Sequence, residues 1–174
     1  MKLKFSLSYL LILLIPVCEA CLILLRLPVS FWGNSEIFFE DDLFYYLQIA
    51  RNIYKGHGPT FDNLTATTGF HPLWQIIIVP FVWLGDELSK PWGALISVIF
   101  LNLVLIMLSI FILQEILKKI INPLVSALSI SLSSTLSLPY IFNGMETSLT
   151  IFLVSLTALK LIGILQKDNP RKSS

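Results

Sequence analysis

The sequence predicts an all-α integral membrane protein with about four transmembrane helices and two shorter juxtamembrane helices in its first outer loop. Three observations support this fold class. Of the 174 residues, 55% are hydrophobic and only 13% are charged, whereas a soluble domain carries about 25% charged residues. Long apolar runs recur along the chain, and basic residues gather at their ends, as the positive-inside tendency requires. Elsewhere Lys and Arg are scattered without a patch, which argues against a nucleic-acid partner.

The first apolar run covers residues 5–27 and is long enough to span a bilayer, since about 20 residues are needed. Two lysines precede it, as in a signal peptide, but the run continues past the small-residue site at Cys18-Glu19-Ala20. We therefore expect a retained signal anchor. Cys18 and Cys21 have C-x-x-C spacing, and because the chain has only 2 cysteines, a structural role is favoured over a metal or redox site.

Residues 28–90 form the predicted outer loop, which concentrates carboxylates, both histidines and turn residues. Apolar side chains at i, i+3 and i+4 spacing predict an amphipathic helix over residues 42–55. It is too short and too charged to span, so we expect it on the membrane surface with its apolar face down. A second helix is predicted over 72–85, with Pro72 at a favoured first position and Gly85 at its end. Its length of about 14 residues falls below the roughly 17 needed to cross.

Three further spans are predicted, over residues 91–117, 123–142 and 148–166. If the 72–85 segment stays outside, the basic residues after the second and fourth spans lie in the cytoplasm with those at the N-terminus. We therefore expect both termini to be cytoplasmic and the loop to lie outside. The chain 1–174 is then a single membrane domain, and the turn at 143–147 faces the same compartment as the loop.

Asp41 and Asp42 stand at the start of the first surface helix. Acidic residues there can cap free backbone N–H groups and complement the helix dipole. With Glu40 they form three consecutive carboxylates, which also suit a general base or metal ligation. From composition alone, such a functional role and helix capping are equally favoured. Arg51 and Lys55, toward the other end of the same helix, could clamp a phosphate or could simply be solvated.

Two further polar residues belong to this outer surface. His71 directly precedes the second helix, where it either positions a substrate or caps the helix. Glu146 lies in the turn between the third and fourth spans, on the same predicted side of the membrane. Two polar regions distant in sequence are therefore expected to face one compartment.

Together these segments resemble the first outer loop of the C-type (GT-C) glycosyltransferases, and in particular the bacterial branch related to arabinofuranosyl- and mannosyltransferases. These are multispan enzymes that take a sugar from a polyprenyl-phosphate donor. The resemblance is carried by Asp41-Asp42 with Phe44-Tyr45-Tyr46, Ile49-Ala50-Arg51-Asn52, Gly56-His57-Gly58, Thr60-Phe61-Asp62, Gly69-Phe70-His71-Pro72-Leu73-Trp74 and Asn143-Gly144-Met145-Glu146-Thr147. The chain departs from the family at Thr68, where Asn is frequent. It is also much shorter than the family enzymes, so the resemblance predicts an N-terminal portion.

The resemblance implies an inverting transfer, in which a loop carboxylate acts as base on the acceptor hydroxyl while the polyprenyl phosphate leaves from the opposite face. It assigns the base to Asp41, with Asp42 as an alternative or an orienting partner. Our candidates for binding the phosphate and the sugar are Arg51, Lys55 and His71, and our candidate for the acceptor side is Glu146.

The resemblance also sets the expected surroundings of the protein. No cofactor or metal is required, because a lipid phosphate can depart without one, although paired acids leave room for a divalent cation. The expected partners are the polyprenyl-phosphate sugar, membrane lipid and further membrane helices from another chain. The expected location is the bacterial inner membrane. A second hypothesis is a non-catalytic membrane module that binds a lipid-linked sugar or partner helices.

Overall fold

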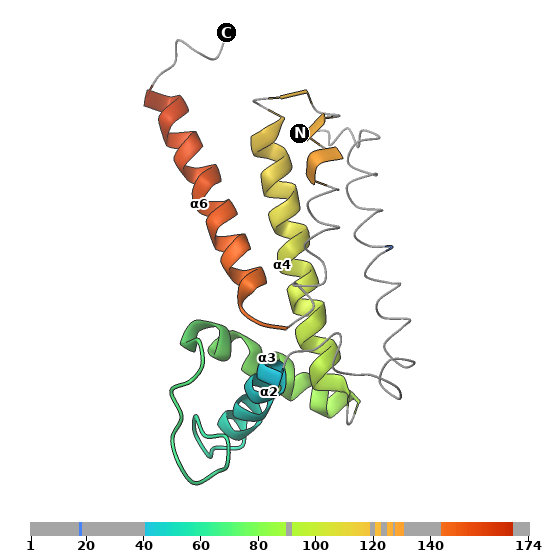
Figure 1. Ribbon diagram of the computed structural model, residues 1–174, viewed down its shortest axis with the longest axis vertical. Helices are drawn as coiled ribbons and strands as arrows, with labels where there is room; N and C mark the ends of the chain where they lie inside the picture. The colour runs from blue at the N-terminus through green and yellow to red at the C-terminus, as the bar shows by residue number, and fades with distance from the viewer. Residues whose placement is uncertain are drawn as a thin grey trace. The chain divides into compact units, whose positions relative to one another are not determined.

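The computed structural model describes Cys18 and residues 41–89, 92–118, 121–122, 125–126, 128–130 and 144–168 (Figure 1). This part of the chain is helical and has no strand, which confirms the all-α class for the described residues. Three expected features lie largely outside them: the span at 5–27 except Cys18, the third span at 123–142 except residues 125–126 and 128–130, and the second cysteine of the C-x-x-C pair.

The chain divides into two compact units. One unit comprises Pro28–Val104 and Pro139–Ser148 and contains the outer loop. The other comprises Met1–Leu27, Leu105–Leu138 and Leu149–Ser174. The candidate site lies entirely within the first unit, so its geometry can be described without reference to the second.

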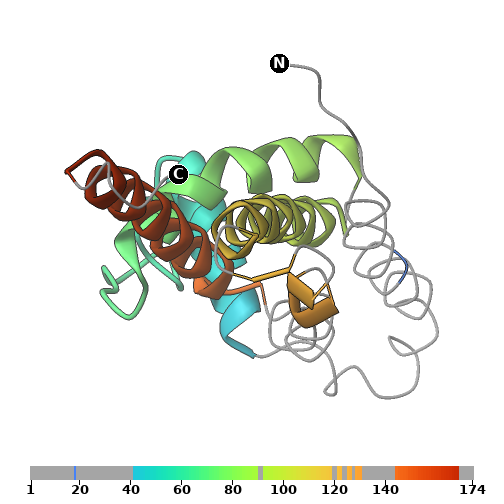
Figure 2. The same cartoon turned by 90° about the horizontal axis from the view of Figure 1, so that it is seen from above.

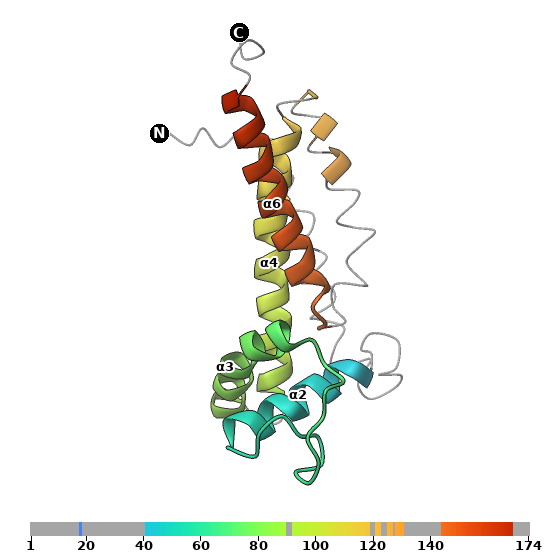
Figure 3. The ribbon, with the colours of Figure 1, turned by 90° about the vertical axis from the view of Figure 1, so that its left-hand side faces the viewer.

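Helix α2, Asp41–Tyr54, begins and ends one residue before the predicted 42–55. The sequence predicts that its apolar face rests on the membrane, and that prediction is wrong. Leu43, Ile49 and Ala50 are fully buried, because α2 packs against α3 (Figure 3). Periodicity identified the apolar face correctly, but protein rather than lipid covers it.

Helix α3, Pro72–Leu88, runs three residues beyond the predicted end at Gly85. Its two faces differ sharply in exposure. One face buries Trp74, Ile78 and Val82, while the other exposes the large apolar side chains of Leu73, Ile76, Trp83, Leu84 and Leu88.

Gly85 does not end α3. Its lack of a side chain instead allows α3 to pack closely against α4. A Cβ on Gly85 would overlap the backbone of Gly93 in the first turn of α4, and a Cβ on Gly93 would overlap the backbone of Gly85. Small residues permit such close backbone approach between helices. Figure 2 looks nearly along α4 and shows α3 lying across it. The helix therefore continues through Gly85 and carries Asp86 into the packed surface.

Helices α4, Gly93–Leu117, and α6, Thr147–Asp168, coincide closely with the predicted spans at 91–117 and 148–166. Within the described residues, these are the two helices long and apolar enough to cross a membrane. Exposed apolar side chains recur along α4 at every fourth position, at Ile96, Phe100, Val104 and Leu108. The four-span arrangement itself extends beyond the described residues.

The turn before α6 presses against α2 at Gly144. Gly144 has a φ of 71°, a left-handed conformation that suits glycine. A Cβ at this position would overlap the side chain of Leu43, which is fully buried in α2. The residue must therefore lack a side chain for the turn to reach the helix.

We predict that Gly144→Ala lowers the free energy of unfolding by about 2–4 kcal/mol, since it adds backbone strain of about 1 kcal/mol and an overpacked contact of about 1–3 kcal/mol. Gly58→Ala is the matched control, because Gly58 has a φ of 75° but nothing within 4 Å of a Cβ. Thermal unfolding in detergent micelles measures both. Equal losses in the two variants would contradict the Leu43 contact, and Leu43→Ala should partly rescue Gly144→Ala.

Candidate functional site

A cleft of about 820 Å³ opens along one side of α2. Positions 41, 44, 48 and 51 lie three or four residues apart, so they line one face of the helix. The loop that follows α2 forms the opposite wall. The described lining residues are Asp41, Asp42, Phe44, Tyr45, Gln48, Arg51, Phe61 and Gly69.

Asp41 and Asp42 lie at the end of the cleft formed by the first turn of α2. Both side chains are exposed, and neither makes a hydrogen bond or ion pair with another residue of the described part of the chain. The helix N-terminus favours negative charge at this position. The two carboxylates are thus available to accept a proton or to bind a ligand.

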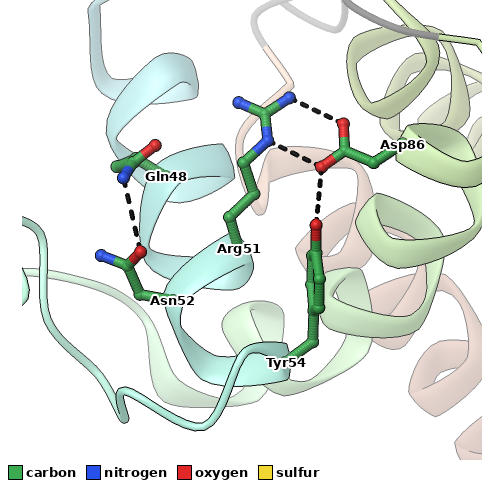
Figure 4. A network of polar contacts seen from close by, with 5 residues as sticks. All are labelled: Gln48, Arg51, Asn52, Tyr54 and Asp86. Atoms are coloured by element: carbon green, nitrogen blue, oxygen red, sulfur yellow. Dashed lines mark hydrogen bonds and ion pairs between the residues drawn. The ribbon is translucent and has the colours of Figure 1, made fainter.

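Arg51 lies at the other end of the cleft and is held by Asp86 of α3 (Figure 4). Its Nε donates to Asp86 Oδ2 at 2.8 Å and its Nη2 donates to Oδ1 at 2.9 Å. This bidentate hydrogen bonding raises the pKa of Arg51 above its ordinary value. Arg51, which the sequence suggests as a phosphate ligand, therefore uses two of its nitrogens to join α2 to α3. Only Nη1 is turned away from Asp86.

Asp86 was not among the candidate residues, although it organises this end of the cleft. Its side chain is only 8% exposed, and it also accepts a hydrogen bond of 2.9 Å from the Tyr54 hydroxyl. Burial, reinforced by the hydrogen bond to Asp86, raises the pKa of Tyr54. The sequence gives little indication of this role, because a helix that ends at Gly85 leaves Asp86 in the linker that follows.

Asn52 anchors the loop that forms the second wall. Its Nδ2 donates to the carbonyl oxygens of Thr60 at 2.8 Å and of Phe61 at 3.1 Å, and the residue is only 2% exposed. Helical spacing places Asn52 on the polar face of α2, and the loop folds back over it. Gln48 Nε2 completes the network by donating to Asn52 Oδ1 at 3.4 Å (Figure 4).

Aromatic side chains cover the middle of the cleft. The rings of Tyr45 and Phe61 stack with centroids 5.1 Å apart and an interplanar angle of 24°. The Tyr45 hydroxyl is hydrogen-bonded to Thr67 Oγ1. Lys55, by contrast, is not among the lining residues; it is exposed, and its Nζ lies 6.0 Å from the ring centroid of Tyr54.

His71 and Glu146 meet in a second cluster beside α2. His71 Nε2 lies 3.0 Å from Glu146 Oε1. The Tyr46 hydroxyl donates to Glu146 Oε2 at 3.4 Å and accepts the His71 backbone N–H at 3.0 Å. Burial is the main reason that the pKa of Tyr46 is raised. His71 occupies the N-cap position of α3 without a side-chain capping bond, so the structure favours its pairing with Glu146 over capping.

The six candidate residues therefore separate into distinct places. The cleft holds Asp41, Asp42 and Arg51, the second cluster holds His71 and Glu146, and Lys55 belongs to neither. Among the described residues, no three His, Cys, Asp or Glu side chains are grouped closely enough to hold a metal ion.

Comparison of the chain with protein-family models, with curated proteins and with solved structures finds no match. A function for this chain is therefore inferred from its sequence motifs and from the geometry of the α2 cleft and of the His71–Glu146 cluster.

We predict that Asp86→Asn lowers the free energy of unfolding by about 2–4 kcal/mol, because it leaves a half-buried guanidinium facing an amide donor. Glu87→Gln changes the neighbouring exposed acid and should cost less than about 0.5 kcal/mol. Thermal unfolding of both variants in detergent micelles makes the comparison. Losses of similar size would show that the Arg51–Asp86 pair does not hold the helices together.

A second prediction concerns alkaline pH. The folded pKa values of Tyr46 and Tyr54 are raised above 10.0, so the stability that depends on the neutral phenols is fully present below pH 10.0 and is lost as the pH rises through the raised values. Urea unfolding across this range should show a falling free energy of unfolding, with a shallower fall in Tyr46→Phe and Tyr54→Phe. If the free energy of unfolding falls as steeply with pH in both variants as in the unsubstituted protein, the raised pKa values of Tyr46 and Tyr54 are contradicted.

Proposed function

We propose that this chain is a membrane glycosyltransferase, or the N-terminal portion of one, which moves a sugar from a polyprenyl-phosphate donor to an acceptor hydroxyl at the α2 cleft. The observation that carries the proposal is the grouping of two exposed carboxylates, an aromatic surface and a guanidinium around one cleft, between α2 and the loop that follows it. An inverting transfer needs a base for the acceptor, a surface for the sugar and a cation near the leaving phosphate.

In the proposed reaction, Asp41 accepts the proton of the acceptor hydroxyl as the hydroxyl oxygen attacks the anomeric carbon. The bond between that carbon and the phosphate oxygen breaks, the phosphate leaves with the electron pair, and the anomeric configuration inverts. Asp42 either orients the acceptor or takes the place of Asp41, since both carboxylates border the cleft. Arg51 Nη1 is the described cationic group best placed to face the phosphate.

The membrane setting is part of the proposal. Helices α4 and α6 have the length and composition of spans, and the exposed apolar face of α3 suits a bilayer interface. A four-span arrangement, with cytoplasmic termini and the loop outside a bacterial inner membrane, would bring a lipid-anchored donor to the cleft. Glu146 is proposed to contact the acceptor side, with His71 beside it.

One observation favours the second candidate, a non-catalytic module that binds a lipid-linked sugar. Arg51 is engaged by Asp86, and Lys55 does not line the cleft. Few cations therefore remain among the described residues to stabilise a leaving phosphate. This candidate retains sugar binding at the aromatic surface without turnover.

We predict that Asp41→Asn reduces sugar transfer in isolated membranes by about 10²- to 10⁴-fold, the usual contribution of a general base. Glu87→Gln, which changes an exposed acid outside the cleft, should retain full activity. The product formed by the unsubstituted protein should carry the inverted anomeric configuration by NMR. Donor binding without any transfer by the unsubstituted protein would instead support the second candidate.

A further inference from the structure

We infer that the stacked pair of Tyr45 and Phe61 is the surface on which the sugar ring rests, and that the cleft selects a neutral or amino sugar over an acidic one. The inference concerns the substrate class of the proposed site and so rests on the proposed function. It begins from side chains that the fold holds in an exposed position.

Each residue of the pair is held by its own hydrogen bond. The backbone carbonyl of Phe61 accepts from the side chain of Asn52, a residue only 2% exposed, while the Tyr45 hydroxyl is bonded to Thr67. The loop is braced further by Asp62, whose Oδ1 accepts the backbone N–H groups of Leu64 at 2.9 Å and Thr65 at 3.0 Å. The aromatic surface is therefore positioned before any ligand arrives.

Without a ligand, the exposure of these aromatic side chains to water is unfavourable. Phe61 remains 49% exposed and Phe44, in the same cleft, 43% exposed. Burial of such a side chain against a ligand is favourable, because it removes apolar surface from water. An anchored loop that keeps an aromatic face in solvent offers that surface to a ligand, and the partly negative ring face matches the C–H groups on the apolar face of a sugar.

The polar groups of the cleft favour a sugar over an isoprenoid chain. Asp41, Asp42 and Gln48 line the same cleft as the stacked rings. A hydrocarbon chain would strip water from these groups and offer no hydrogen bond in return, which is costly. A sugar ring presents an apolar face to the aromatic surface and hydroxyl groups to the carboxylates and the amide.

The charges of the cleft narrow the class of sugar. Asp86 compensates the charge of Arg51 through its bidentate contact, whereas Asp41 and Asp42 have no cationic partner among the described residues. The local potential is therefore negative, so a uronic acid would be repelled. An ammonium group on the sugar would be attracted by the carboxylates and by the aromatic faces.

The test measures binding of polyprenyl-phosphate sugars to the full chain carrying Asp41→Asn, which is the inactive background under the proposed function. Phe61→Leu should weaken binding of a neutral-sugar donor about five- to tenfold, and Phe61→Trp should restore it. Leu64→Ala is the matched control, since Leu64 lies in the same loop, is 86% exposed and does not line the cleft. In otherwise unsubstituted protein, Phe61→Leu should raise KM more than it lowers kcat.

Comparison of head groups completes the design. Polyprenyl phosphate without a sugar should bind Phe61→Leu and its parent equally. In protein that keeps both Asp41 and Asp42, with no acceptor present, a uronic acid donor should bind at least tenfold more weakly than the neutral or amino sugar. Equal binding by Phe61→Leu and its parent, equal loss with sugar-free polyprenyl phosphate, or preference for the uronic acid would overturn the inference.

The inference and the proposed function fail in different ways. Sugar binding that depends on Phe61, together with no transfer by the unsubstituted protein, would contradict the proposed enzyme activity and support sugar binding at the aromatic surface. Transfer that depends on Asp41 but is unaffected by Phe61→Leu would support the enzyme activity and contradict sugar binding at the aromatic surface.

Discussion

The bidentate pair between Arg51 and Asp86 fixes α2 against α3, and the cleft depends on it. Asp86 is nearly buried, and a carboxylate in that position requires a cation and hydrogen-bond donors. Arg51 supplies two donors and Tyr54 a third. Because the contact fixes the rotation of α2, it also decides which side chains of that helix enter the core and which line the cleft.

The remaining faces of α2 hold the other parts of the site. Asn52 ties down the loop that carries Phe61, and Tyr46 binds both His71 and Glu146. Gly144 lets the outer turn approach close to Leu43. One short helix therefore organises a cleft on one side and a separate polar cluster on another.

Local patterns in the sequence predicted the helices well and their surroundings less well. The apolar spacing located α2 to within one residue, and the charge pattern placed His71 and Glu146 on one surface, where His71 Nε2 lies 3.0 Å from Glu146 Oε1. Periodicity divides a helix into two faces but does not say what covers each face. Asn52 therefore falls on the polar face of α2, although a loop buries it. Gly85 resembled a helix end although Gly93 packs on it, and that reading hid Asp86. The roles of these residues in sugar transfer stay predictions.

The central claim is that a lipid-linked sugar occupies the cleft beside α2. Photocrosslinking in native membranes tests it most directly, with a polyprenyl-phosphate donor that carries a diazirine on the sugar and with peptide mapping by mass spectrometry. The account predicts adducts within residues 41–51 and 61–69 that excess unlabelled donor suppresses. Adducts confined to α6 or to the exposed face of α3, or labelling that unlabelled donor does not suppress, would contradict it.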